Sequence, residues 1–283
     1  MNYYIIIPVY NEEKFISALL DSVLIQTLKP KKVIVVNDNS TDNTAEIITE
    51  FEKKSDLIHQ VLNISKNIHL PGSKIVRAFE KGLELLDEEY DFIVKLDADL
   101  ILPENYFEYI AKTFIKNPKV GIAGGFAYIL KNNKWVLENL TDKHHVRGVF
   151  KAYRKACFIE IGGLKPAMGW DTVDELLCRY YGWEVETLSE LKVKHFKPTG
   201  ANYSKSARYN QGEAFYVLGY GLVLTFIASI KLALRKKKPL LFIDYIEGYF
   251  IAKKKKLPLL VTDNQAKFVK EYRWKKIREK LFK

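Results

Sequence analysis

Short apolar runs alternate with amphipathic segments through residues 1–100, and this alternation restricts the fold more than any other feature of the chain. Apolar runs typical of strands cover residues 5–8, 32–36, 61–64 and 92–96. Helical spacing of apolar residues covers 12–26, 43–53 and 73–86. Strands that alternate with helices form a mostly parallel sheet covered on both faces. The predicted class is therefore α/β, with ligands bound at the carboxyl ends of the strands.

Polar residues follow the first, second and fourth predicted strands, at residues 8–12, 37–44 and 97–99. The third cluster places Asp97 and Asp99 near the end of an apolar run. Ionised carboxylates that close a core strand are costly unless a cation or hydrogen bonds compensate them. Mg²⁺ or Mn²⁺ shared with a substrate diphosphate would do so. Solvated turn residues before Pro103 are an equally compatible interpretation of this segment alone.

The composition indicates a globular protein of a reducing compartment. A chain of 283 residues with 48% hydrophobic content can form one large domain, or one domain with an appendage. Cys157 and Cys178 match neither a redox nor a zinc motif, so we expect both to be reduced core residues of a cytoplasmic protein. The N-terminal segment lacks a basic region and a cleavage site, and no secretion signal is expected.

The net charge of +11 lies in the C-terminal part of the chain. Residues 231–283 hold 17 Lys and Arg against 5 Asp and Glu, whereas residues 1–230 have a net charge of −1. Before this basic tail, residues 214–230 are uncharged. This segment is shorter than the roughly 20 residues of a membrane-spanning helix and contains two glycines, which favours a buried or interfacial helix.

Basic runs at 235–238 and 253–256 alternate with apolar and aromatic stretches. This pattern suits an anionic bilayer surface and favours peripheral attachment to the inner face of the cell membrane. A solvated basic tail and a nucleic-acid patch are the alternatives. Because no base-reading module precedes the tail, nucleic acid is not a predicted partner.

Three motifs carry a resemblance to a known family. P-V-Y-N-E-E at 8–13, V-N-D-N-S-T-D-N-T at 36–44 and L-D-A-D at 96–99 resemble, in order and spacing, the nucleotide-sugar-binding half of the family 2 glycosyltransferases. The likeness continues through segments 121–125, 150–164 and 169–175. It implies a GT-A (Rossmann-like) domain over 1–212, with a nucleotide-binding half (1–100) and an acceptor half (101–212). A basic, amphipathic helical segment, 213–283, follows.

The resemblance implies that the loop after the first strand, with Pro8, Tyr10 and Glu12, holds the nucleoside together with Asp38. A carboxylate such as Asp38 suits this role because charge-assisted hydrogen bonds are about twice as strong as neutral ones. Neighbouring polar residues are better explained as turn and helix-capping groups: Ser40, Asp42 and Asn43.

The helix predicted at 73–86 follows a Pro-Gly turn, so its free N–H groups could receive phosphate. Lys74 and Arg77 lie three residues apart on one face of that helix and would add positive charge. An ordinary solvated helix face explains the same two residues equally well.

By resemblance, Asp99 is the direct metal ligand of the D-x-D motif, and Asp97 contacts the ribose or the metal. The metal, Mg²⁺ or Mn²⁺, neutralises the departing nucleoside diphosphate as a Lewis acid. His195 is a further candidate ligand or diphosphate contact, because related sequences carry a similar segment after the last strand of the sheet and imidazole suits Mn²⁺. The alternative is a half-buried strand histidine.

The family places its catalytic base in the acid-rich loop that corresponds to residues 169–175. The spacing aligns Asp171 with that base, and Asp174 is the fallback. The base would take the proton of the acceptor hydroxyl as it attacks the anomeric carbon, which inverts the configuration. As a structural alternative, the two aspartates are the N-cap and N3 residues of the next helix.

Together these features predict a metal-dependent, inverting, hexosyltransferase-type glycosyltransferase. It would move a sugar from a UDP-, GDP- or dTDP-linked donor to an envelope glycan or a lipid-linked acceptor. Two alternatives remain at this level. A nucleotidyltransferase of sugar-phosphate activation also combines paired aspartates with Mg²⁺, although it usually has a Gly-rich phosphate loop after the first strand. A catalytically silent nucleotide-sugar-binding module at the membrane is the other.

Overall fold

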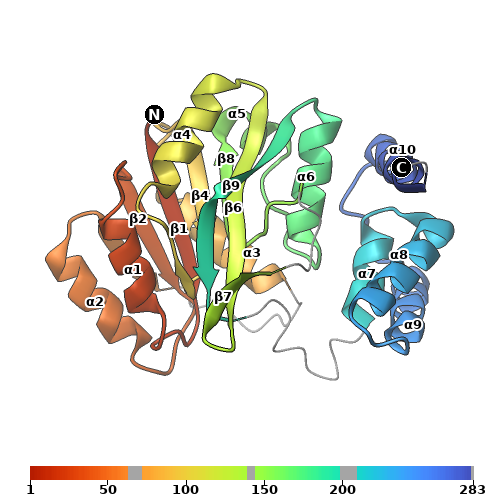
Figure 1. The fold of residues 1–283 in the computed structure, drawn as a ribbon, viewed down its shortest axis with the longest axis horizontal. Coiled ribbons are helices and arrows are strands. Elements are labelled where there is room, and N and C mark those ends of the chain that lie inside the picture. Colours follow the sequence, from red (N-terminus) through yellow and green to blue (C-terminus); the bar gives the residue numbers. More distant parts are fainter. Residues whose placement is uncertain (63–71, 139–143, 198–208, 282–283) are drawn as a thin grey trace. The chain divides into compact units, whose positions relative to one another are not determined.

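The computed structural model describes residues 1–62, 72–138, 144–197 and 209–281 (Figure 1). The chain forms two compact units. Unit 1 comprises Met1–Ile68, Lys74–Gly163 and Tyr181–Ala201. Unit 2 comprises His69–Ser73, Leu164–Tyr180 and Asn202–Lys283.

Unit 1 is built around one sheet, which has nine strands in the described part of the chain. The order is β3-β2-β1-β4-β8-β6-β9-β5, and β7 pairs with β6. The strands are β1 (Tyr3–Val9), β2 (Lys32–Asn37), β3 (Ile58–Leu62), β4 (Phe92–Leu96), β5 (Leu100–Ile101), β6 (Val120–Lys131), β7 (Lys134–Leu137), β8 (Phe150–Arg154) and β9 (Glu184–His195). Strands β1 to β4 are parallel, as predicted, whereas β8 is antiparallel to both β4 and β6.

Helices cover both faces of this sheet, which confirms the predicted α/β class. They are α1 (Ile16–Leu24), α2 (Thr44–Lys54), α3 (Ser73–Leu83, of which Ser73 belongs to unit 2), α4 (Tyr106–Lys116) and α5 (Lys155–Glu160). Gly82 of α3 approaches Ile6 and Val36 so closely that a Cβ would meet their methyl groups at 2.6 and 3.0 Å. On the opposite face, Tyr3 stacks on Phe92 with their ring centroids 4.7 Å apart, and α4 covers this pair.

The predicted elements of residues 1–100 lie close to the observed ones. β4 has the predicted bounds, and the first helix is shorter than predicted at both ends, by four residues at its start and two at its end. The third strand begins three residues earlier than predicted, and the predicted residues 63–64 lie outside the described residues. Cys157 and Cys178 are both free and buried, as predicted.

Unit 2 is helical, with α6 (Trp170–Tyr180), α7 (Asn210–Val217), α8 (Gly221–Arg235), α9 (Leu241–Lys254) and α10 (Asp263–Leu281). The prediction of one apolar helix over residues 214–230 is wrong, because Gly219 and Gly221 take positive φ angles of 71° and 73° and separate α7 from α8. Among the described residues, no helix combines the length and hydropathy that crossing a membrane requires.

Candidate active site

Two loops at the carboxyl edge of the sheet are bonded to each other. Asn11, at a positive φ of 52°, donates its N–H to Ser40 Oγ at 3.0 Å, and its side-chain oxygen accepts the N–H of Thr41 at 2.8 Å. The N–H of Glu12 donates to Thr44 Oγ1 at 2.8 Å. The loop after β1 is therefore fixed against the loop after β2, and residues of both loops can contact the same ligand.

Asp42 has the structural role that its position at the start of α2 predicts. Its carboxylate accepts the N–H of Thr44 at 3.1 Å and the N–H of Glu13 at 3.2 Å. Desolvation opposes the charge, but these bonds and one from the Thr44 hydroxyl outweigh it and lower the pKa of Asp42. Asn43 occupies the N-cap position without a side-chain capping bond.

The residues predicted to hold the nucleoside lie in or next to these two loops. Pro8 is buried near the end of β1, and Tyr10 follows the strand with 57% of its surface exposed. Asp38 directly follows β2, is half-buried, and donates its N–H to the carbonyl of Val9 at 2.8 Å. The structure thus brings Pro8, Tyr10 and Asp38 to one edge of the sheet.

Asp99 and His195, which are far apart in the sequence, lie side by side in unit 1. Leu100 of β5 pairs with His195 at the end of β9, and this pairing places Asp99 Oδ2 3.3 Å from His195 Nε2. The N–H of Lys197 donates to the same carboxylate oxygen at 3.2 Å. The side chains of Asp99 and His195 are both buried. His195 is therefore the last residue of a strand and does not follow one, and it is buried, whereas the alternative interpretation expected a half-buried strand histidine.

The electrostatics of this pair favour charge on both partners. Desolvation disfavours the charged imidazolium, but the carboxylates of Asp99 and Glu138 outweigh that cost and raise the pKa of His195 to about 9. Desolvation also opposes the charge of Asp99, but His195 and Lys197 outweigh it and lower the pKa of Asp99. Asp99 is therefore an anion held at the edge of a buried polar cluster.

Glu138 and Arg147 complete this cluster, and the sequence did not identify either of them. Glu138, directly after β7, has a side chain only 2% exposed and forms a salt bridge with Arg147 Nη1. Its Oε2 lies 3.7 Å from Nδ1 of His195, which is beyond hydrogen-bonding distance. The imidazole is thus placed between two carboxylates, Asp99 at Nε2 and Glu138 at Nδ1.

Two further ion pairs lie near the strand ends. Lys95, which is 1% exposed within β4, pairs with Asp97 Oδ1. Lys197 Nζ bonds both carboxylate oxygens of Glu12, at 2.6 and 2.5 Å. Desolvation raises the pKa of Glu12, and Lys197 counteracts this effect. Glu12 thus connects the loop after β1 to the segment after β9, which its predicted nucleoside role did not include.

The remaining predicted residues lie on helices. Lys74 and Arg77 are exposed on α3, as both the phosphate-binding and the solvated-face interpretations require. Asp171 and Asp174 belong to unit 2. The first helical hydrogen bonds of α6 go to the carbonyl of Gly169, so Asp171 is the second helical residue and not the N-cap. Asp171 is half-buried, and Asp174 is 1% exposed.

The residues present fit a divalent ion that is shared with a substrate. Within the described segments, no group of three or more His, Cys, Asp or Glu side chains could hold a metal by itself. Asp99 offers one carboxylate, and His195 offers one imidazole nitrogen when the ion displaces its Nε2 proton. Such a partial donor set suits an ion whose other ligands are diphosphate oxygens and water.

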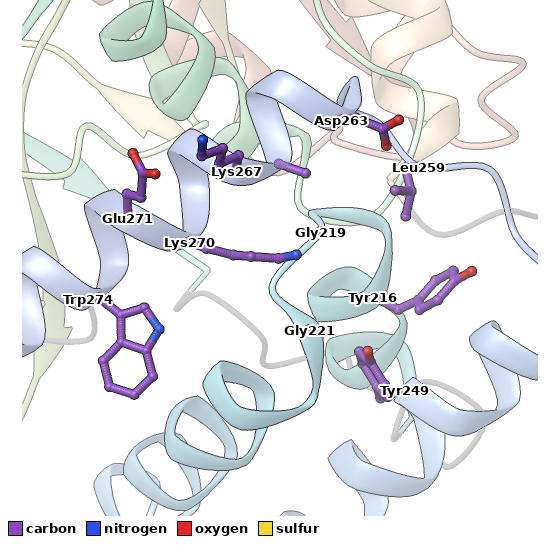
Figure 2. A pocket seen from close by; sticks show the side chains of 11 residues that line it. Tyr216, Gly219, Gly221, Tyr249, Leu259, Asp263, Lys267, Lys270, Glu271 and Trp274 are labelled. Carbon is purple, nitrogen blue, oxygen red and sulfur yellow. The ribbon is translucent and has the colours of Figure 1, made fainter.

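A separate hollow of about 500 Å³ lies within unit 2, between α7, α8, α9 and α10. Tyr216, Tyr249 and Trp274 contribute aromatic rings to its lining, and Figure 2 shows Lys270 extending towards the turn between α7 and α8. None of the predicted site residues lines this hollow.

Comparison with known proteins supplies the family. The model of glycosyl transferase family 2 matches residues 4–164. Poly-beta-1,6-N-acetyl-D-glucosamine synthase of Staphylococcus epidermidis is 28% identical in an alignment of length 182 that covers 58% of this chain and 40% of the synthase. The chain therefore matches less than half the length of that relative.

Solved structures share the fold at lower identity. Residues 1–349 of S. aureus TarS, in complex with UDP-GlcNAc, align with a TM-score of 0.55 and 17% identity over 89% of this chain and 73% of that TarS fragment. The mannosyltransferase PcManGT from Pyrobaculum calidifontis, in complex with GDP-Man and Mn²⁺, aligns with a TM-score of 0.57 and 16% identity over 89% of this chain and 75% of that protein. These likenesses show a GT-A fold.

Proposed function

Because the chain belongs to glycosyl transferase family 2, and is thus a glycosyltransferase, we propose that it moves a sugar from a nucleotide-sugar donor to an envelope glycan or a lipid-linked saccharide. The observation that carries this proposal is the buried pair of Asp99 and His195, 3.3 Å apart at the carboxyl edge of the sheet. Family membership also favours glycosyl transfer over the nucleotidyl transfer that paired aspartates alone would allow.

In this proposal Asp99 and His195 hold Mg²⁺ or Mn²⁺ together with the donor diphosphate. When bound, the ion stabilises the negative charge of the departing nucleoside diphosphate as a Lewis acid. Asp97 contacts the ribose or the ion, and Lys95 fixes its orientation through their salt bridge. The solved complexes of TarS with UDP-GlcNAc and of PcManGT with GDP-Man and Mn²⁺ support a nucleotide-sugar donor and a divalent ion.

The nucleoside would occupy the two bonded loops after β1 and β2. Asp38 would accept a hydrogen bond from the base or the ribose, beside Pro8, Tyr10 and Glu12. The half-buried carboxylate of Asp38 supports this role, because a charge-assisted bond there is partly shielded from water. Lys74 and Arg77 are exposed cations that would add contacts to phosphate.

Asp171 would act as the general base that deprotonates the acceptor hydroxyl, so that the sugar is transferred with inversion. Its position supports this role over Asp174, because a half-buried carboxylate remains accessible to an acceptor while one that is 1% exposed does not. The name of the staphylococcal synthase and the UDP-GlcNAc bound in the TarS complex indicate the first pair to test: UDP-GlcNAc as donor and poly-beta-1,6-N-acetyl-D-glucosamine as acceptor.

The basic C-terminal segment leads us to place this reaction at the inner face of the cell membrane. Residues 231–283 carry a net charge of +12, which an anionic bilayer would attract. A lipid-linked or envelope acceptor would be available at the same surface.

The decisive experiment is a thermal-shift screen of UDP, GDP, CDP and dTDP with and without Mn²⁺. One nucleotide should stabilise the protein more strongly with Mn²⁺ than without it, because ligands that bind only the folded state raise its stability. Asp99→Ala should abolish the dependence on Mn²⁺, whereas Asp56→Ala, at an exposed residue near the start of β3, should retain it. The proposal would be refuted if none of the nucleotides stabilised the protein. It would also be refuted if Mn²⁺ increased the stabilisation of the Asp99→Ala variant as much as that of the native chain.

A further inference from the structure

Helix α8 exposes large apolar side chains along one face. Leu222, Val223, Phe226, Ile230 and Leu234, here called the α8 patch, are 39–67% exposed. At 3.6 residues per turn these five positions fall within a sector of about 120°. They therefore form one continuous stripe along the helix.

The buried side chains of α8, which pack within unit 2, are mostly small or hydroxyl-bearing. They are Thr225, Ser229, Ala233 and one large apolar residue, Leu224, all at most 4% exposed, and the hydroxyl of Thr225 donates to the carbonyl of Gly221 at 2.7 Å. A helix at a water-exposed surface normally has the opposite arrangement, with its large apolar residues directed inward. The stripe is thus not explained by the packing of unit 2.

Cations and further apolar residues adjoin the α8 patch. Leu240 is 75% exposed in the turn between α8 and α9, and Ile243 in the first turn of α9 is 58% exposed. Exposed basic side chains lie at the end of α8 and in the same turn: Lys231, Arg235, Lys237 and Lys238. Apolar side chains next to cations match the acyl chains and anionic headgroups of a bilayer.

We infer that the α8 patch and the turn after it dock on the surface of an anionic bilayer, with α8 lying in the plane of the interface. This inference rests on the membrane location proposed above and identifies the surface that provides it. A second copy of the chain fits less well, because residues 221–243 contain no acidic side chain that could pair with these cations across a contact between copies. Moreover, the 15 residues of α8 span only about 22 Å, so the helix would lie on the bilayer and not cross it.

The test is co-sedimentation of the full chain with vesicles of phosphatidylcholine containing about 30% phosphatidylglycerol, against vesicles of phosphatidylcholine alone. The anionic vesicles should bind the protein at low salt, and about 0.5 M salt should weaken binding. The double variant Val223→Asp, Leu234→Asp should lower binding at least about tenfold, because it places charge within the apolar contact. Both side chains are more than 60% exposed, so the fold should tolerate their replacement.

Ile115→Asp is the matched control, since Ile115 is 66% exposed on α4 of unit 1 and should leave binding unchanged. Lys237→Gln with Lys238→Gln should lower binding to anionic vesicles without affecting the melting temperature. An absence of binding by the native chain, or equal binding by the Asp double variant, would overturn the inference. A dimer in sedimentation velocity that the same double variant dissociates, without vesicle binding, would overturn it in favour of a second copy.

The result of the vesicle test can be distinguished from the result of the nucleotide test. Nucleotide stabilisation in the thermal-shift screen needs no vesicles, and the Val223→Asp, Leu234→Asp variant should retain it. If the double variant does not bind vesicles but still binds nucleotide, the result concerns the docking surface alone. If the native chain binds no nucleotide, the proposed donor site is refuted.

Discussion

Replacement of Glu138 by Gln tests whether this buried carboxylate orients His195. The substitution keeps the shape of the side chain and removes its charge. In the native structure Glu138 forms a salt bridge with Arg147, and its Oε2 lies 3.7 Å from Nδ1 of His195. At this distance the negative charge of Glu138 would favour a proton on Nδ1, which leaves Nε2 as the nitrogen that can bind a metal.

The cost in stability follows from burial. The side chains of Glu138 and Arg147 are 2% and 8% exposed, so Glu138→Gln removes a charged partner of a buried guanidinium. Removal of one partner from a buried ion pair costs about 3–5 kcal/mol. At the lower figure we expect the melting temperature to fall by roughly 6–12 °C.

The assay combines a double-mutant cycle with a binding measurement. Glu138→Gln and Arg147→Met should each lower the free energy of unfolding, measured by urea denaturation. The loss in the double variant should be about 2 kcal/mol smaller than the sum of the two single losses. Calorimetric titration with Mn²⁺ and the nucleotide found in the thermal-shift screen should show a 10–100-fold weaker metal affinity for Glu138→Gln, as is common when such a partner is removed.

The control is Glu50→Gln, at an exposed residue in the middle of α2, which should change neither stability nor metal affinity. Additive losses in the cycle would show that Glu138 and Arg147 are not coupled. Native metal affinity in a folded Glu138→Gln variant would refute the idea that Glu138 orients His195.

Three further predictions concern other parts of the chain. Asp42→Ala should cost about 1 kcal/mol in urea denaturation at neutral pH, and because its pKa is lowered in the folded state, the loss should shrink as the pH falls below about 4 and the carboxylate is protonated. Gly212→Ala should destabilise unit 2 by about 1–3 kcal/mol and increase hydrogen exchange in α7 and α9, because the new Cβ would lie 1.9 Å from the carbonyl oxygen of Tyr245. A gain in stability, as at an ordinary helical glycine, would contradict the close approach of α7 to α9 at Gly212. Asp171→Asn should bind the donor normally in calorimetry and lose turnover by about a hundredfold or more, and retained turnover would move the proposed base to Asp174.

The parallel half of the sheet was predictable because its determinants are local. Strands β1, β2 and β4 are short apolar runs, and the polar residues that follow them mark their carboxyl ends. Parallel strands bring those ends to one edge, so the loops after β1 and β2 could be placed together before their hydrogen bonds were known. Asp42 is a further local case, because a side chain that caps a helix contacts residues next to it in the sequence.

The polar cluster around His195 depends on contacts between distant residues, and a single sequence does not contain them. Glu138 follows a short hairpin strand, and in sequence it resembles an ordinary exposed acid. Only the pairing of β6 with β7 and β9 buries it beside the histidine. The break between α7 and α8 had a local indication in Gly219 and Gly221, but the uncharged composition of the segment outweighed it in the prediction.

The position of His195 follows from the pairing of β9 with two other strands. On one side β6 pairs with β9 from Val120 to Ile129, with a register shift between Gly124 and Phe126, and Ile129 is the partner of His195. On the other side only Leu100 and Ile101 pair with β9. Since side chains alternate between the faces of a strand, a slip of one residue would direct the imidazole away from Asp99. The long β6 pairing therefore sets the face on which His195 lies, and the two-residue strand β5 brings Asp99 within reach of it.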